Sequence, residues 1–135
     1  MLSVLVVEDD YSIADMLKEA LEKSGYRVSS IARTVEEALT SAELQVPDFA
    51  IIDIRLANGG HGAEIGVRLR ATTQAGILFS TGNSNDGTLT KSEGDAVVTK
   101  PYKLNDVALA LKIIHQVREF GRTDLKLPSN FRLLE

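Results

Sequence analysis

The sequence predicts an α/β domain built on a parallel β-sheet with helices on both faces. Short apolar runs alternate along the chain with amphipathic segments of helical period. Most of these runs are apolar at nearly every position, as strands covered on both faces are. The chain has 135 residues, 44% of them hydrophobic, which is enough for one compact core. Together these features favour a three-layer fold with right-handed crossovers.

Five short segments rich in β-branched and apolar residues are predicted to be strands. They cover residues 2–7, 27–32, 49–54, 77–80 and 96–99. The second (RVSSIA) is more polar than the others, as an edge strand would be. Because helical segments separate consecutive strands, the strands are expected to run parallel. The favoured strand order is 2-1-3-4-5, the flavodoxin-like arrangement.

The helices between the strands are predicted from apolar residues three or four positions apart. Thr34, followed by a glutamate three residues later, forms a capping box that starts the second helix. Asn105 is the predicted cap of the last helix. The predicted helices span about residues 13–25, 35–44, 63–71 and 105–120.

One segment, between Gly82 and Gly94, does not fit the alternation. The topology requires a helix there, but Leu89 is its only large apolar residue. Its glycine, asparagine, serine and threonine residues favour turns over helix. We therefore expect the fourth helix to be weak or mobile.

Composition and charge narrow the functional classes. The net charge of −4 is unfavourable for binding nucleic acid through its phosphates. No apolar run approaches the ~18 residues of a membrane span, and the N-terminus does not resemble a signal peptide. The absence of cysteine excludes disulfides and thiolate chemistry. The expectation is a cytoplasmic domain with neither nucleic acid nor membrane as a partner.

Polar side chains stand at the carboxyl ends of four of the predicted strands. Residues 8–10 (Glu-Asp-Asp) follow the first strand, Asp53 ends the third, residues 81–82 (Thr-Gly) follow the fourth and Lys100 follows the fifth. Each of these residues alone is a common turn or cap residue. Because the carboxyl ends of parallel strands meet at one rim of the sheet, we expect these residues to lie together.

Such a rim suits phosphoryl transfer. Neighbouring carboxylates repel one another unless a cation is present, and Mg²⁺ prefers carboxylate and phosphate oxygens. Lys100 supplies a compact positive charge, the Thr81 hydroxyl can donate to a phosphoryl oxygen, and Gly82 lets the backbone approach it. A carboxylate nucleophile, Asp53, would give an aspartyl phosphate.

The motifs VLVVEDD, DFAIIDIRL, ILFSTG and VVTKPY resemble those of the receiver domains of two-component response regulators, over about residues 2–120. The resemblance implies that Asp53 is the phosphoacceptor and that Thr81 and Lys100 contact the phosphoryl group. It also implies a cis peptide bond between Lys100 and Pro101. The implied ligands of Mg²⁺ (or Mn²⁺) are Glu8, Asp9, Asp53 and the backbone carbonyl of Arg55.

Two features set the chain apart from the family pattern. Val97 stands where the family usually has an aromatic residue, which argues against the usual threonine–aromatic switch. The run LFSTG resembles the FAT GUY subgroup of receivers, whose fourth helix can be weak or mobile. This agrees with the composition of the segment after Gly82.

The resemblance implies a single-domain response regulator, with a receiver domain at residues 1–120 and a C-terminal extension at 121–135. It would take a phosphoryl group from a histidine kinase or a histidine phosphotransfer protein, and act through a downstream protein or as a phosphate sink. We expect self-catalysed phosphoryl transfer rather than an enzyme, in a monomer or weak dimer.

Three alternative functions fit the sequence less well. A degenerate receiver would bind partners without phosphorylation. The presence of Asp53, Lys100 and the acid pair argues against this alternative but leaves it open. A haloacid-dehalogenase-like phosphatase needs a second acid where Arg55 stands. In a flavodoxin-like electron carrier, the acids at residues 8–10 would repel the FMN phosphate.

Two histidines and the C-terminal apolar residues are interpreted as structural. His61 is expected to be a solvated loop residue, and His115 to be half-buried and hydrogen-bonded. The apolar residues of the extension are expected to pack on their own domain or fray in preference to contacting a partner. These residues are Leu125, Leu127, Phe131, Leu133 and Leu134.

Overall fold

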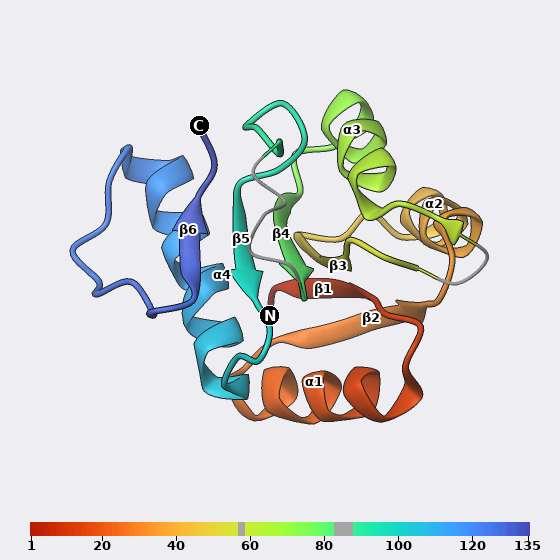
Figure 1. Ribbon diagram of the computed structural model, residues 1–135, viewed down its shortest axis with the longest axis horizontal. Helices are drawn as coiled ribbons and strands as arrows, with labels where there is room; N and C mark the ends of the chain where they lie inside the picture. Colours follow the sequence, from red (N-terminus) through yellow and green to blue (C-terminus); the bar gives the residue numbers. More distant parts are fainter. Residues whose placement is uncertain (57–58, 83–87) are drawn as a thin grey trace.

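The computed structural model describes residues 1–56, 59–82 and 88–135, and its centre is one six-stranded sheet in the order β2-β1-β3-β4-β5-β6 (Figure 1). The first five strands run parallel in the predicted order, and β6 is antiparallel to β5. The sixth strand corrects the prediction of a five-stranded sheet. The strands are β1 (Ser3–Val7), β2 (Arg27–Ala32), β3 (Phe49–Asp53), β4 (Gly76–Thr81), β5 (Ala96–Thr99) and β6 (Phe131–Leu133).

Helices cover both faces of the sheet, as predicted. On one face, α1 and α4 pack together, and on the other α2 packs against α3 (Figure 1). Alternate residues of β1 enter the two cores, because successive side chains of a strand point to opposite faces. The helices are α1 (Tyr11–Lys23), α2 (Val35–Leu44), α3 (Gly62–Thr72) and α4 (Leu104–Phe120). None of the helices in the described ranges is long and apolar enough to cross a bilayer.

The helix starts follow local hydrogen bonds. The Thr34 hydroxyl accepts from the Glu37 backbone N–H at 3.1 Å, which confirms this half of the capping box. The prediction that Asn105 caps α4 is wrong. The helix begins one residue earlier, at Leu104, and its cap position is Lys103, which makes no side-chain capping bond. Asn105 therefore lies in the first turn.

The connection between β4 and β5 contains no helix in its described part, residues 88–95. Leu89 is nevertheless buried, at 6% exposure, in the core on the α2–α3 face. The lack of helix at residues 88–95 agrees with the expectation that the fourth helix is weak. Residues 83–87, to which the same expectation applies, lie outside the described part of the chain.

The C-terminal segment packs on its own domain. β6 pairs with β5 in the register Ala96↔Leu133 and Val98↔Phe131. Phe131 enters the core on the α1–α4 face, and Leu134 enters the core on the other face. A three-residue strand leaves too little sequence for a period to be recognised, so it was not predicted.

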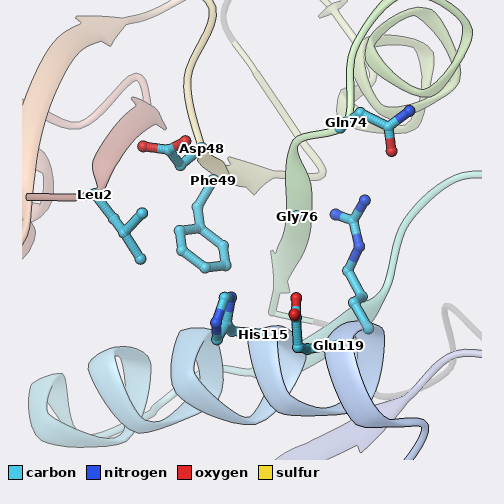
Figure 2. Close-up of a pocket in the computed structure, with 8 residues that line it drawn as sticks. Leu2, Asp48, Phe49, Gln74, Gly76, His115 and Glu119 are labelled. Atoms are coloured by element: carbon cyan, nitrogen blue, oxygen red, sulfur yellow. The ribbon is translucent and has the colours of Figure 1, made fainter.

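A cleft of about 320 Å³ opens at the amino ends of β3 and β4, against the last turns of α4 (Figure 2). It lies at the opposite end of the sheet from the predicted site. His115, on its wall, corrects another expectation: the side chain is exposed, and its ring packs edge-on against Phe49 with 6.5 Å between the centroids. His61 is exposed as expected, and it caps α3 by accepting from the Ala63 N–H.

Candidate functional site

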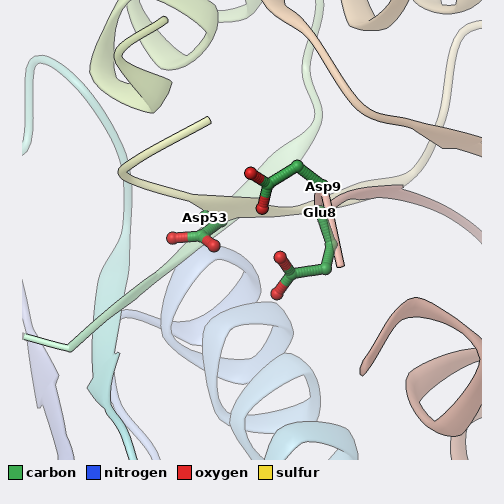
Figure 3. Close-up of side chains that lie close together, drawn as sticks. All are labelled: Glu8, Asp9 and Asp53. Atoms are coloured by element: carbon green, nitrogen blue, oxygen red, sulfur yellow. The ribbon is translucent and has the colours of Figure 1, made fainter. Parts of the chain in front are cut away.

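Three carboxylates gather at the carboxyl ends of β1 and β3 (Figure 3). Glu8 and Asp9 follow β1 directly, and Asp53 is the last residue of β3. One carboxylate oxygen from each of the three lies within 4.8 Å of the others. Glu8 and Asp53 are only 3% and 7% exposed, so their charges are largely withdrawn from water. The parallel topology thus brings together side chains far apart in the sequence.

The acidic loop after β1 is held by hydrogen bonds. The Glu8 N–H donates to the Ala32 carbonyl at 2.9 Å, which continues the pairing with β2. The Asp10 N–H donates to the Glu8 carboxylate at 3.2 Å. Asp10 caps α1, and its carboxylate accepts from the Ser12 N–H at 2.9 Å. Asp10 is therefore a capping residue, and Glu8 and Asp9 remain the two acids of this loop that meet Asp53.

Two groups contact the Asp53 carboxylate directly. The Arg55 N–H donates to Oδ1 at 3.2 Å, and the Lys100 ammonium lies 3.1 Å from Oδ2. Lys100 is also 3.6 Å from Glu8 Oε1, so one cation faces two buried carboxylates. On the far side, a side chain at Gly62 would collide with the Asp53 backbone carbonyl. Glycine there lets α3 begin directly behind the site.

The end of β4 lies beside Lys100. The Lys100 N–H donates to the Thr81 carbonyl at 2.7 Å, and the Lys100–Pro101 peptide is cis, as expected. Thr81 is buried, at 5% exposure. The space around the Gly82 Cα is open, so the backbone there is accessible to a ligand.

Among the described residues, the site has more acidic side chains than positive charges to balance them. Burial, and then the charge of Asp53, raise the pKa of Glu8 to about 7, because the hydrogen bond from the Asp10 N–H and the charge of Lys100 only partly offset them. Burial by itself lowers the pKa of Lys100, but the charges of Asp53 and Glu8 outweigh it, and the net direction is upward. Burial, with these same two acids, raises the pKa of the Tyr102 hydroxyl to about 12.

This donor set fits a hard divalent cation. Mg²⁺ takes oxygen ligands, usually one or two carboxylates with the rest of its shell left to water and phosphate. Glu8, Asp9 and Asp53 offer oxygens close enough to share one ion, and a cation there would relieve the repulsion that raises the pKa of Glu8.

Arg33 belongs to the surroundings of the site and was not predicted. Its Nε and Nη2 both donate to the Asp9 carbonyl, at 3.3 and 3.1 Å. Its guanidinium stacks on the Tyr11 ring, 4.2 Å from the centroid. Since Arg33 directly follows β2, the same rule that placed Asp53 and Lys100 at this rim could have placed Arg33 there.

Val97 lies on β5, three residues before Lys100, and is 2% exposed. It belongs to the same apolar cluster as Phe79, Leu89 and Leu134. Leu134 comes from the C-terminal segment, so this segment covers part of the face of β5 that carries Val97.

Comparison with known proteins identifies the class. Residues 4–112 match the family described as the response regulator receiver domain, so the chain belongs to this family. The chain is 35% identical over 116 residues to the transcriptional regulatory protein YvrH of Bacillus subtilis, covering 82% of this chain and 47% of that protein. It spans about half the length of the curated relatives it matches.

Solved structures agree with the fold. The receiver domain of a modulated diguanylate cyclase from Desulfovibrio desulfuricans G20 is 29% identical, with a TM-score of 0.74, over 88% of this chain and 98% of that chain. The response regulator PhyR from Brucella abortus is 26% identical, with a TM-score of 0.72, over 89% of this chain and 52% of that chain.

Proposed function

We propose that Asp53 is the phosphoacceptor of this receiver domain, with a histidine kinase or a histidine phosphotransfer protein as the donor. The observation that carries the proposal is the convergence of Glu8, Asp9 and Asp53 on one point, with Lys100 3.1 Å from Asp53. Phosphoryl transfer depends mainly on positioning and charge neutralisation, and this arrangement supplies both.

In the proposed reaction, an Asp53 carboxylate oxygen attacks the phosphorus of a phosphohistidine. The new O–P bond forms as the N–P bond breaks, and the electron pair of that bond stays on the imidazole nitrogen. Lys100 neutralises a phosphoryl oxygen and the Thr81 hydroxyl donates to another. Mg²⁺ or Mn²⁺, held by Glu8, Asp9, Asp53 and the Arg55 carbonyl, would supply the remaining positive charge. Attack of water on phosphorus later breaks the O–P bond, which returns the free Asp53 carboxylate and releases inorganic phosphate.

We propose that the phosphorylated domain acts through a downstream protein or drains phosphate from a kinase. The membership in the response regulator family supports a signalling role of this kind. The run LFSTG and the turn structure of residues 88–95 support assignment to the FAT GUY subgroup. Such a receiver would signal without the usual aromatic switch.

The test incubates the protein with acetyl phosphate and Mg²⁺ and measures its intact mass. We expect one phosphoryl group on the wild type and none on Asp53→Asn. Asp124→Asn is the matched control, because Asp124 is an exposed acid on the C-terminal segment, and it should be phosphorylated like the wild type. A wild type that stays unmodified with both acetyl phosphate and a kinase would instead indicate a degenerate receiver.

A further inference from the structure

Both residues that flank Lys100 are hydrogen-bonded to Asn130, in the C-terminal segment. The Thr99 N–H donates to the Asn130 carbonyl at 2.9 Å, and the Asn130 side-chain amide donates to the Pro101 carbonyl at 2.6 Å. With the bond from the Lys100 N–H to Thr81, the backbone at Lys100 is fixed from two sides. One side is β4 and the other is the segment that follows α4.

Asn130 is itself held in place by the strand that follows it. β6 pairs with β5 from Phe131 to Leu133, and the Leu134 N–H donates to the Asp95 carbonyl at 2.9 Å. Phe131 and Leu134 are 7% and 5% exposed, so they anchor the segment in both cores. The position of Asn130 therefore follows from buried contacts.

We propose that residues 130–135 hold the turn that carries Lys100 into the phosphate-binding site, with Asn130 as the positioning residue for Lys100. The proposal rests on the proposed role of Lys100 as a phosphoryl ligand. A lysine side chain is long and flexible, so the place its ammonium can reach depends on where its backbone is held. A functional group must lie within about 0.5 Å of its productive position, which backbone bonds on both sides of Lys100 favour.

The hydrogen bond from the Asn130 side chain is not needed for the pairing of β5 with β6. The Asn130 backbone carbonyl already makes the bond to Thr99 that continues the β5–β6 pairing. The side-chain amide reaches past the end of β5 to Pro101, which has no N–H and offers only its carbonyl to hold this turn. This bond acts on the turn that carries Lys100.

The experiment separates metal binding from phosphoryl binding. Mg²⁺ is titrated first, and beryllofluoride, a phosphoryl mimic, is then titrated at saturating Mg²⁺, both followed by backbone amide NMR shifts. Asn130→Ala should weaken beryllofluoride binding by about threefold to tenfold, the effect of one neutral hydrogen bond. Its Mg²⁺ affinity should stay within about twofold of the wild type, because the carboxylates are untouched.

Ser129→Ala, on the neighbouring exposed residue, is the matched control and should bind both ligands like the wild type. Deletion of residues 130–135 should weaken beryllofluoride binding more than Asn130→Ala does. Wild-type beryllofluoride affinity in Asn130→Ala would overturn the inference, and so would an equal loss of Mg²⁺ and beryllofluoride affinity. Wild-type protein that binds beryllofluoride no better than Asp53→Asn would overturn the proposed function, and this inference with it.

Discussion

A cluster of buried charged side chains lies at each end of β5. At one end a single acid pairs with two cations, and at the other a single cation pairs with two acids. Asp95, just before the strand, is 8% exposed and lies 2.9 Å from Arg70 and 3.7 Å from Arg118. Its carboxylate also accepts the Ile77 N–H at 2.8 Å. Just after the strand, Lys100 is the one cation among the described residues that pairs with Asp53 and Glu8.

The difference separates a cluster whose charges balance within the fold from one whose carboxylates could share a cation. At Asp95, one carboxylate has two cations and a backbone donor, and so its charge is compensated within the protein. At the other end, within the part of the chain that the structure describes, three acids lie together and one cation, Lys100, contacts them. The pKa of Glu8 is raised to about 7. Uncompensated buried charge is costly, and a bound cation relieves the cost.

The largest expected effect is on stability at the compensated end. Asp95→Ala should lower the free energy of unfolding by about 4 kcal/mol, because it leaves the Arg70 and Arg118 charges and the Ile77 N–H without their partner. Asp53→Asn, which relieves repulsion, should leave the free energy of unfolding in EDTA unchanged or raise it. Urea denaturation of both variants measures these free energies of unfolding. A similar loss of stability in Asp95→Ala and Asp53→Asn would contradict the distinction between the two clusters.

The second prediction concerns pH. Since the pKa of Glu8 is raised from 4.5 to about 7, the folded protein keeps this proton between these pH values while the unfolded chain loses it. Stability from this group is therefore present below pH 4.5 and is lost as pH rises to about 7. The loss is on the order of 3 kcal/mol.

Urea denaturation in EDTA across this pH range, with Glu8→Gln as the reference, measures the effect of Glu8. The difference between the two proteins should follow the pH, because glutamine does not titrate. Saturating Mg²⁺ should flatten the dependence. A constant difference between the wild type and Glu8→Gln would show that the site does not raise the pKa of Glu8.

The third prediction concerns the metal. Mg²⁺ at ten times its dissociation constant should raise the free energy of unfolding by about 1.4 kcal/mol, since it binds only the folded chain. Asp53→Asn should lose most of this gain at the same concentration, whereas Asp124→Asn should keep it. Thermal unfolding with and without Mg²⁺ checks this. Equal stabilisation of Asp53→Asn and the wild type would place the ion elsewhere.

The smallest expected effect belongs to Arg33. Removing its two bonds to the Asp9 carbonyl with Arg33→Ala should weaken Mg²⁺ binding by about twofold to fivefold, while Asp9 itself remains. Mg²⁺ titration by NMR measures the change. Arg122→Ala, on an exposed residue of the C-terminal segment, is the control and should bind Mg²⁺ like the wild type.

The sequence predicted the main part of the site because its residues directly follow strands. Asp53 and Lys100 meet as a consequence of parallel pairing, and no other information was needed to place them at one rim. Arg33 directly follows β2, so the same rule could have placed it at this rim, although the sequence gives no sign of its bonds to the Asp9 carbonyl. Asn130 was missed because its side chain bonds to a distant backbone carbonyl, and such a bond leaves no periodic trace in a sequence. The cap of α4 was misplaced by two residues, since Asn105 is a good capping residue but the backbone is already helical at Leu104 and the cap position is Lys103.

The pairing of β6 with β5 also limits how the sheet can associate with other chains. An unpaired strand edge is a template for addition of a foreign strand. β5 has no unpaired edge, because it lies between β4 and β6 in the sheet. The new edge, β6, is three residues long and offers few bonds to an added strand. Edge-to-edge aggregation would therefore have to use β2, whose partly exposed serines and exposed Arg27 make it a poor template.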